Sequence, residues 1–265
     1  RMGQRIIVVD AFTDRAFAGN PAAVCVLDGE REPEWMQQVA LEMNHSETAF
    51  LLHRPEGWSL RWFTPTTEVD LCGHATLASA HVLWEEGLAP ADAPLPFHTR
   101  SGLLTAKRRG EWITMDFPAT PDEPATEPEG LARSLGVPIR YVGTTRFDTL
   151  IEIEDEASLR MLRPYLRRME EMSRRGFIVT AVAAPGAGYD FASRFFAPGS
   201  GVDEDPVTGS AHCALGPYWA ERMGKTELVG YQCSPRGGTV RVEVRGDRVI
   251  LAGQAVTTMR GELAV

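Results

Sequence analysis

The sequence lacks an excess of basic residues, and this limits the partners that the protein can have. Its 265 residues include 27 Lys and Arg but 36 Asp and Glu, which gives a net charge of -9 and a pI near 5.2. Nucleic-acid-binding domains normally present a basic stripe, and anionic membrane surfaces also attract basic segments. We therefore expect no nucleic-acid partner and no membrane partner. A small ligand remains compatible with this charge, because one pocket can differ in sign from the whole surface.

Cysteine is scarce as well, and long apolar runs are missing. The four cysteines, Cys25, Cys72, Cys213 and Cys233, show no C-x-x-C spacing. This argues against a zinc site and against a disulfide framework. No apolar run approaches membrane-spanning length, and residues 1–9 are too short for a cleavable signal peptide. The sequence therefore predicts a cytoplasmic protein with reduced thiols and no bound metal.

The most informative feature that is present is an internal repeat. The segment Gly73–Ala75 recurs as Gly209–Ala211, 136 residues later. Three further pairs follow the same order along the chain: Gly102–Thr105 with Gly238–Arg241, Gly110–Glu111 with Gly246–Asp247, and, at a shift of 133, Arg61–Pro65 with Arg194–Pro198. The shift is about half the chain and far longer than a solenoid repeat, so it indicates a duplicated domain.

Each copy predicts a similar series of strands around one apolar helix. In the first copy the expected strands are Arg5–Val9, Ala22–Leu27, Glu47–Leu52 and Leu60–Phe63, the helices are Pro33–Met43 and Thr76–Glu86, and a hairpin joins Gly102–Arg108 to Trp112–Phe117. In the second copy the strands lie near Arg140–Val142, Thr149–Ile153, Phe177–Ala183 and Ser193–Phe196, followed by the helix Ala211–Met223 and the hairpin of Val240–Val244 with Val249–Ala252.

The pattern predicts an α+β fold of two pseudo-symmetric domains. The stretch Pro118–Glu129, rich in Pro, Thr, Asp and Glu, is the expected linker. We therefore expect domains at residues 1–118 and 119–265, the last few residues being able to pack on the first domain. The segment Ala75–Trp84 is apolar nearly all round, which is typical of a buried helix. Each domain is expected to be a β-barrel or curled sheet around such a helix.

Both apolar helices are expected to begin at glycine-containing turns. A helix N-terminus presents unpaired N–H groups and a partial positive charge, which suits an anion. Two such termini facing across a domain cleft would bind the carboxylate of a small acid.

Several motifs resemble the PhzF-like family of phenazine biosynthesis proteins. They run in order along nearly the whole chain: Val9–Thr13, Gly19–Ala22, Ser46–Phe50, Phe63–Pro65, Glu68–Thr76, Phe195–Pro198, Glu204–Ala211 and Gly253–Val256. The resemblance implies a diaminopimelate-epimerase-like fold and usually a homodimer. It also implies an isomerase that needs no cofactor and relocates a proton on a small cyclic acid.

The resemblance also assigns roles to residues of this sequence. Glu47 matches the family's general acid/base, and His74, Asp205 and Ser210 match its polar pocket residues. Gly73 and Gly209 match the backbone that holds the ligand. We accordingly expect Glu47, Asp205 and His74 to be catalytic, and Gly73, Gly209 and Ser210 to bind substrate.

The residues themselves also allow interpretations in which they have no catalytic role. Glu47 shares a strand face with Ala49 and Leu51, where burial would raise its pKa and suit proton transfer, but a strand-end glutamate is often solvated. His74 could cap or pack at the helix start. Asp205 stands in the acidic run 203–205, which is usually a solvated loop, although Pro206 would stiffen its presentation.

Cys72 supports a second interpretation. Epimerases of the same fold use two opposed cysteines, and Cys72 lies where one of them would sit. The second half has Thr208 at the matching position, and Cys213 is better explained as a buried core residue. A cysteine-assisted epimerase or racemase is therefore the first alternative. A PhzF-like protein that binds a ligand without catalysis is the second.

Overall fold

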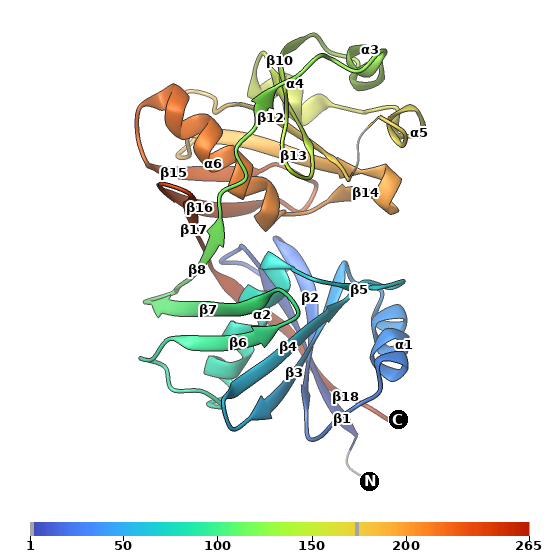
Figure 1. The fold of residues 1–265 in the computed structure, drawn as a ribbon, viewed down its shortest axis with the longest axis vertical. Helices are drawn as coiled ribbons and strands as arrows, with labels where there is room; N and C mark the ends of the chain where they lie inside the picture. The colour runs from blue at the N-terminus through green and yellow to red at the C-terminus, as the bar shows by residue number, and fades with distance from the viewer. Residues whose placement is uncertain (1–2, 173–174, 265) are drawn as a thin grey trace. The chain divides into compact units, whose positions relative to one another are not determined.

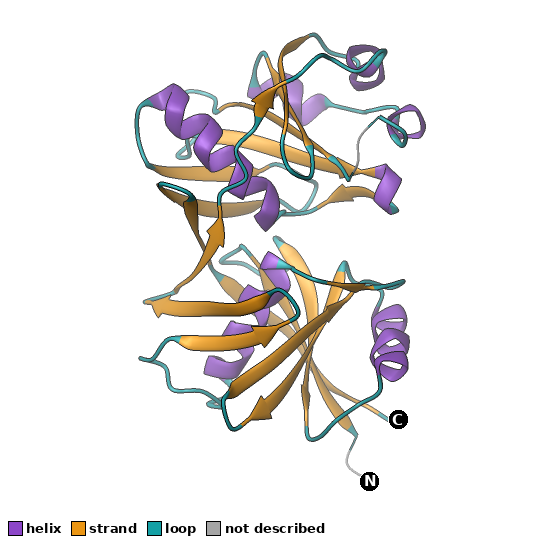
Figure 2. Ribbon diagram, in the orientation of Figure 1, coloured by secondary structure: helices purple, strands orange, loops and turns teal. Residues whose placement is uncertain are grey.

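The chain folds into two compact units, which a computed structural model describes for residues 3–172 and 175–264. The first unit comprises residues 1–116 and 252–265, and the second comprises residues 117–251. The C-terminal segment therefore belongs to the first unit over more than the last few residues, because strand β18 (Ala255–Leu263) pairs along the whole of β1 (Gln4–Ala11). Strands form most of the regular structure in both units (Figures 1 and 2).

The first unit is a curved sheet whose strands pair in the order β18–β1–β2–β3–β4–β6–β7–β8, with the short β5 paired to β4. Its other strands are β2 (Asn20–Leu27), β3 (Glu47–Arg54), β4 (Gly57–Phe63), β5 (Glu68–Val69), β6 (Leu95–Thr99), β7 (Gly102–Arg109) and β8 (Trp112–Pro118). Closure of this sheet into a barrel stays a prediction.

Helix α2 (Gly73–Glu85) is the buried helix of the first unit, as its composition predicted. Ten of its side chains are buried, from His74 to Trp84. The helix ends at Glu85, one residue before the predicted Glu86, and Gly87 follows the C-cap residue Glu86; the φ of 67° at Gly87 lets the N–H of Leu88 reach back to the carbonyl of Leu83 at 2.8 Å. Helix α1 (Pro33–Met43) matches its predicted bounds and buries one stripe, Met36, Val39 and Ala40.

The second unit contains a matching set of elements. Its strands are β9 (Glu123–Pro124), β10 (Ile139–Thr144), β11 (Thr149–Ile153), β12 (Phe177–Val182), β13 (Phe191–Ala197), β14 (Val202–Asp205), β15 (Glu227–Gln232), β16 (Gly238–Arg245) and β17 (Arg248–Gly253). Its helices are α3 (Leu131–Leu135), α4 (Glu156–Met161), α5 (Leu166–Met169) and α6 (Gly209–Met223), with a 3-10 turn at Pro198–Ser200.

The two units repeat one pairing pattern, which agrees with the duplication inferred from the sequence. In the first, β2 and β3 are parallel, β3 and β4 antiparallel, and β4 is parallel to β6. In the second, β11 and β12 are parallel, β12 and β13 antiparallel, and β13 is parallel to β15. Helices α2 and α6 follow corresponding strands. The fold is mixed α and β and consists mostly of strands.

Three local expectations need correction. The acidic run 203–205 is not a loop, because it lies in β14, which pairs with β13. The expected linker contains β9, which pairs with β10. Both central helices begin earlier than predicted, at Gly73 and Gly209, so that His74 and Ser210 lie in their first turns.

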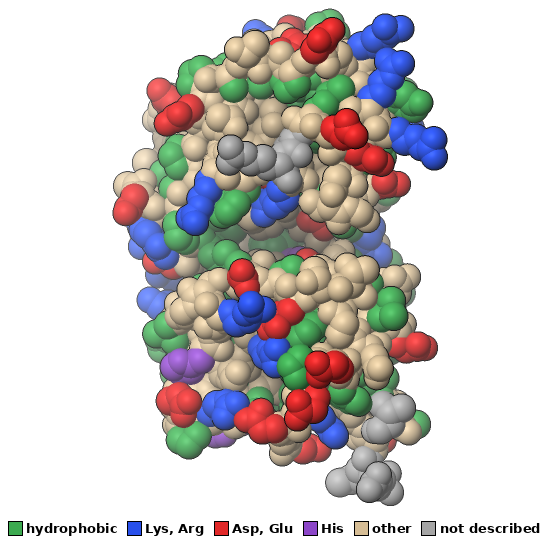
Figure 3. All heavy atoms as spheres, turned by 45° about the vertical axis from the view of Figure 1, so that its right-hand side comes forward, with side chains coloured by type: hydrophobic (Ala, Val, Ile, Leu, Met, Phe, Trp, Pro, Cys, Tyr) green, Lys and Arg blue, Asp and Glu red, His purple; other side chains and the backbone are tan. Residues whose placement is uncertain are grey.

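Charges of both signs are mixed on the face of the molecule that Figure 3 draws. On the face drawn in Figure 3, Lys and Arg side chains lie among Asp and Glu side chains on both units. Across the part of the chain that the structure describes, no helix has the length and apolar character needed to cross a membrane. All four cysteines lie in that part as buried thiols, and none of them forms a disulfide.

Candidate functional site

Glu47 stands at the head of a buried strand in the first unit. It is the first residue of β3 and pairs with Ala22 of the parallel strand β2. Helix α1 ends at Asn44, whose left-handed φ of 52° turns the chain toward β3. The side chain of Glu47 is 20% exposed, and its Oε2 is buried. The carboxylate is therefore largely shielded from water, as its place on the strand predicted.

His74 lies between Glu47 and Cys72. Its Nε2 is 3.3 Å from Oε2 of Glu47, and its Nδ1 is 3.4 Å from Sγ of Cys72. Burial, with a smaller effect of His45, lowers the pKa of His74 from 6.5 to about 3, so the imidazole is neutral near pH 7. A neutral imidazole has one donor and one acceptor nitrogen. Since the Cys72 thiol can donate to Nδ1, we assign the proton to Nε2, the nitrogen that faces Glu47, although the contact between Nε2 and Oε2 does not have hydrogen-bond geometry.

Within residues 3–172 and 175–264, the same three residues are the candidate metal ligands. A carboxylate oxygen of Glu47, Sγ of Cys72 and a ring nitrogen of His74 lie within 4.8 Å of one another. However, Glu47 and Cys72 face different nitrogens of the imidazole, and an ion bound through one nitrogen would be directed toward only one of them. The arrangement suits movement of a proton across the ring better than a shared ion.

The predicted residues of the second unit surround the start of α6. Asp205 ends β14 and accepts a hydrogen bond from Oγ1 of Thr208. The fully buried Gln232 orders this turn, since its Nε2 donates to the backbone oxygen of Asp205 at 2.8 Å and its Oε1 accepts from the N–H of Thr208 at 2.8 Å. Gly209 begins the helix, and Ser210 follows it.

Neither central helix is capped by the side chain of its N-cap residue. The N-cap residues, Cys72 for α2 and Thr208 for α6, have extended backbones, and neither side chain makes a cap hydrogen bond. Unpaired N–H groups of a first helical turn attract anions. The structure thus gathers Glu47, His74 and Gly73 in the first unit, and Asp205, Gly209 and Ser210 in the second.

Sequence reasoning missed two residues beside this second group. Gln232 is one, and Arg175, whose Nη2 donates to Oγ of Ser210 at 3.0 Å, is the other. The repeat contained a signal for Arg175, because it lies just before β12 as Ser46 and Glu47 lie at the start of β3. No local pattern distinguishes Gln232 from other strand residues.

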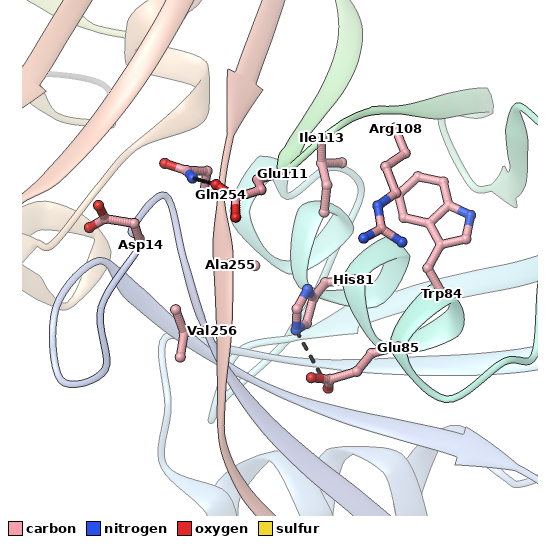
Figure 4. Close-up of a pocket in the computed structure, with 10 residues that line it drawn as sticks. All are labelled: Asp14, His81, Trp84, Glu85, Arg108, Glu111, Ile113, Gln254, Ala255 and Val256. Carbon is pink, nitrogen blue, oxygen red and sulfur yellow. Dashed lines mark hydrogen bonds and ion pairs between the residues drawn. The ribbon is translucent and has the colours of Figure 1, made fainter. Parts of the chain in front are cut away.

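A separate cavity opens at the other end of α2 (Figure 4). Its volume is about 300 Å³, and its lining includes His81 from α2, Arg108 from β7, Glu111 from the turn between β7 and β8, and residues of β8 and β18. His74 and His81 are seven residues apart on the helix, or roughly 10 Å along its axis. None of the predicted site residues lines this cavity. We base the site on the buried cluster at Glu47, because that is where titratable side chains meet out of water.

Comparison with known proteins gives one consistent answer. Residues 9–261 match the phenazine biosynthesis-like protein family. An uncharacterized isomerase of Halalkalibacterium halodurans is 56% identical over 97% of each chain. A crystal structure of a PhzF-family phenazine biosynthesis protein from Enterococcus faecalis aligns over 100% of both chains with 39% identity and a TM-score of 0.95. A hydroxyproline epimerase from Agrobacterium vitis shares the fold alone, at 10% identity and a TM-score of 0.64 over 99% of this chain and 93% of that one.

These matches extend over nearly the whole chain, so they concern both units and not one of them. Two further relatives, from Pseudomonas aeruginosa, are also named uncharacterized isomerases. The interpretation as a non-catalytic binding protein therefore loses its support. The chain belongs to the phenazine biosynthesis-like (PhzF) family and is an isomerase.

Proposed function

We propose that this isomerase moves a proton between two positions of a small, cyclic or unsaturated carboxylic acid, with Glu47 as general acid and base. The observation that carries the proposal is the shielded carboxylate of Glu47, 3.3 Å from a buried, neutral imidazole. A carboxylate in such a place can take a proton from carbon and return it at another carbon.

The substrate's own conjugation would stabilise the charge that develops, so the step as proposed uses no cofactor. His74 would hold the carboxylate of Glu47 in position through Nε2–H, and Asp205 would orient polar groups of the substrate. The backbone at Gly73 would bind polar groups of the substrate, and so would the backbone at Gly209 together with Ser210. A homodimer remains an expectation from the family.

The test is proton exchange with solvent. Small cyclic and unsaturated acids are incubated with the protein in D2O, and deuterium incorporation at carbon is followed by NMR. Glu47→Gln keeps the shape of the side chain and removes the base, so exchange should fall by about 10²- to 10⁴-fold. The matched control is Glu30→Gln, because Glu30 is an exposed surface partner of Arg54 and should leave the rate unchanged. Undiminished exchange by Glu47→Gln would refute the proposal.

The position of Cys72 supports a second candidate function, a cysteine-assisted epimerase. Sγ of Cys72 lies 3.4 Å from Nδ1 of His74, on the side of the ring opposite the Glu47 contact. A cysteine-assisted epimerase would use this thiol as one of its acid/base groups. Loss of turnover on thiol alkylation, matched by a similar loss in Cys72→Ser, would favour it.

A further inference from the structure

Arg175 is fixed in the second unit by a buried carboxylate. Its Nε donates to Oδ1 of Asp148 at 2.8 Å, and its Nη2 contacts Oδ2. The side chain of Asp148 is only 2% exposed. A buried carboxylate that lacks a cation is costly, so this pair holds the guanidinium in one orientation.

The orientation aims Arg175 at a predicted substrate-binding residue. Its Nη2 also donates to Oγ of Ser210 at 3.0 Å, in the first turn of α6. The rings of Phe147 and Phe195 lie 5.0 and 5.7 Å from the guanidinium carbon. Among the residues that the structure describes, none accepts a hydrogen bond from Nη1, and the side chain is 36% exposed. The guanidinium is thus immobilised but still accessible to a ligand.

The internal repeat shows which residue of the first unit corresponds to Arg175, which its local contacts do not show. Thr48 is opposite Phe63 in the first unit, and Phe177 is opposite Phe196 in the second. Since Phe63 and Phe196 correspond in the repeat, Glu47 corresponds to Gly176, and Ser46 corresponds to Arg175.

The position equivalent to the acid/base residue holds no side chain in the second unit. A Cβ at Gly176 would lie 2.5 Å from Cζ of Phe195 and 2.9 Å from the backbone oxygen of Phe196. The functional group is therefore displaced by one residue, to Arg175. One copy of the duplicated domain presents an anion at this place, and the other copy presents a cation.

We propose that Arg175, acting with Ser210, binds the carboxylate of the substrate; this rests on the proposed function, which takes the substrate to be a carboxylic acid. Arginine suits the task because a guanidinium donates to a carboxylate in a fixed geometry, and such charge-assisted bonds are strong. Nη1 supplies the new donor, while Nε and Nη2 keep the contact with Asp148.

The experiment compares an acid with its neutral amide. The probes are 2-aminobenzoate and 2-aminobenzamide, which differ only in the carboxylate, and their dissociation constants are measured by calorimetry on the full chain. The wild-type protein should prefer the acid, and Arg175→Met should weaken acid binding by about 10- to 100-fold while changing amide binding by no more than about twofold. Arg175→Lys should retain part of the preference. Equal loss for both probes, or no preference in the wild type, would overturn the assignment.

A double variant and a separate exchange assay distinguish loss of carboxylate binding from unfolding and from failure of the proton transfer. Arg175→Met leaves the charge of Asp148 buried without its cation and could unfold the protein, so the double variant Arg175→Met/Asp148→Asn removes both charges and should fold and show the same loss of acid preference. A double variant that keeps the preference would also overturn the proposal. Deuterium exchange is scored separately: loss of acid preference together with exchange unaffected by Glu47→Gln refutes the proton transfer alone, and the reverse result refutes the role of Arg175.

Discussion

Sγ of Cys72 lies 3.4 Å from Nδ1 of His74, across the imidazole from the carboxylate of Glu47. The thiol can therefore serve in two ways, as an acid/base group or as the donor that fixes the ring. Cys72→Ser and Cys72→Ala separate these roles. A positioning role predicts that Ser, which still donates, keeps turnover within about 10-fold, whereas Ala, which does not, lowers it further. Turnover is measured by the exchange assay.

The turnover of Cys72→Ser, compared with that of Cys72→Ala, decides between the two roles of the thiol. A loss of more than about 10³-fold in Cys72→Ser would assign proton transfer to the thiol and favour the epimerase. The control is Cys213→Ser. Burial raises the pKa of the Cys213 thiol to about 12, and Thr120 is hydrogen-bonded to its backbone oxygen rather than to sulfur. This variant should change stability and not the rate.

Two buried histidines should make the fold sensitive to acid. Burial lowers the pKa of His74 to about 3 and that of His212 to about 4, from 6.5 in each case. Between pH 6.5 and these values the unfolded chain binds more protons than the folded one, so stability is complete above pH 6.5 and falls as the pH falls. Each histidine should remove about 2 kcal/mol of unfolding free energy between pH 6.5 and 5.

Urea unfolding at pH 7 and pH 5 measures this loss, and His212→Gln should reduce the difference by the share of one histidine. The ring resonances of His74 in NMR spectra should stay those of a neutral imidazole at pH 5. A titration midpoint of His74 between pH 6 and 7 would contradict the prediction and would point to a stabilising effect of the Glu47 carboxylate.

The sequence predicted the elements that have a strong local pattern. Helix α1 has its expected bounds, and α2 was recognised by its apolar surface. The start of α2 was placed three residues late, because Gly73 and His74 have weak helix propensity and the preceding turn decides where the helix begins. Strand β5 is two residues long and has no pattern to detect.

Contacts between distant residues could not be predicted in this way. The pairing of β1 with β18 joins Val8 to Met259, and no local period carries that information. The approach of Glu47 to His74 likewise depends on a non-local feature, the register of β2 and β3, which no local pattern predicts. Arg175 stands in an arginine-rich segment, and only the repeat, followed through its strand pairs, distinguishes it.

Each copy of the repeat contains an arginine–glutamate ion pair, and the two arginines differ in their exposure to solvent. Arg61 binds both oxygens of Glu68 at 2.7 and 2.8 Å, and Arg194 binds both oxygens of Glu204 at 2.8 Å. The Arg61 side chain is 30% exposed and that of Arg194 only 6%. Arg194→Met should cost about 3–5 kcal/mol of stability, because it removes a buried guanidinium that pairs with Glu204 and also donates to the backbone oxygens of Leu159 and Leu162. Arg61→Met should cost about 1 kcal/mol or less, because Arg61 is partly exposed and Glu68 keeps its contact with Arg100 at 3.0 Å.

Chemical denaturation of both variants measures the two costs. The double variant Arg194→Met/Glu204→Gln should recover part of the loss, since it also removes the unpaired charge. Equal costs for the two arginines would show that burial does not control the strength of these pairs.

Gly253 is the last residue of β17, and its α-carbon is closely surrounded by buried side chains. A Cβ there would lie 2.4 Å from Cδ1 of Phe12 and 2.7 Å from Cδ1 of Leu77, and both side chains are fully buried. Phe12 is held at a φ of 62°, which leaves it little freedom to move aside. Gly253→Ala should therefore destabilise the protein by about 1–3 kcal/mol. Gly261→Ala is the matched control, because among the described residues, its two chain neighbours aside, no atom lies within 4 Å of the added Cβ, and the loss of a glycine slightly favours folding. Thermal unfolding should show a lower midpoint for the first variant only, and similar midpoints for both would mean that the packing around Phe12 yields to the extra methyl group.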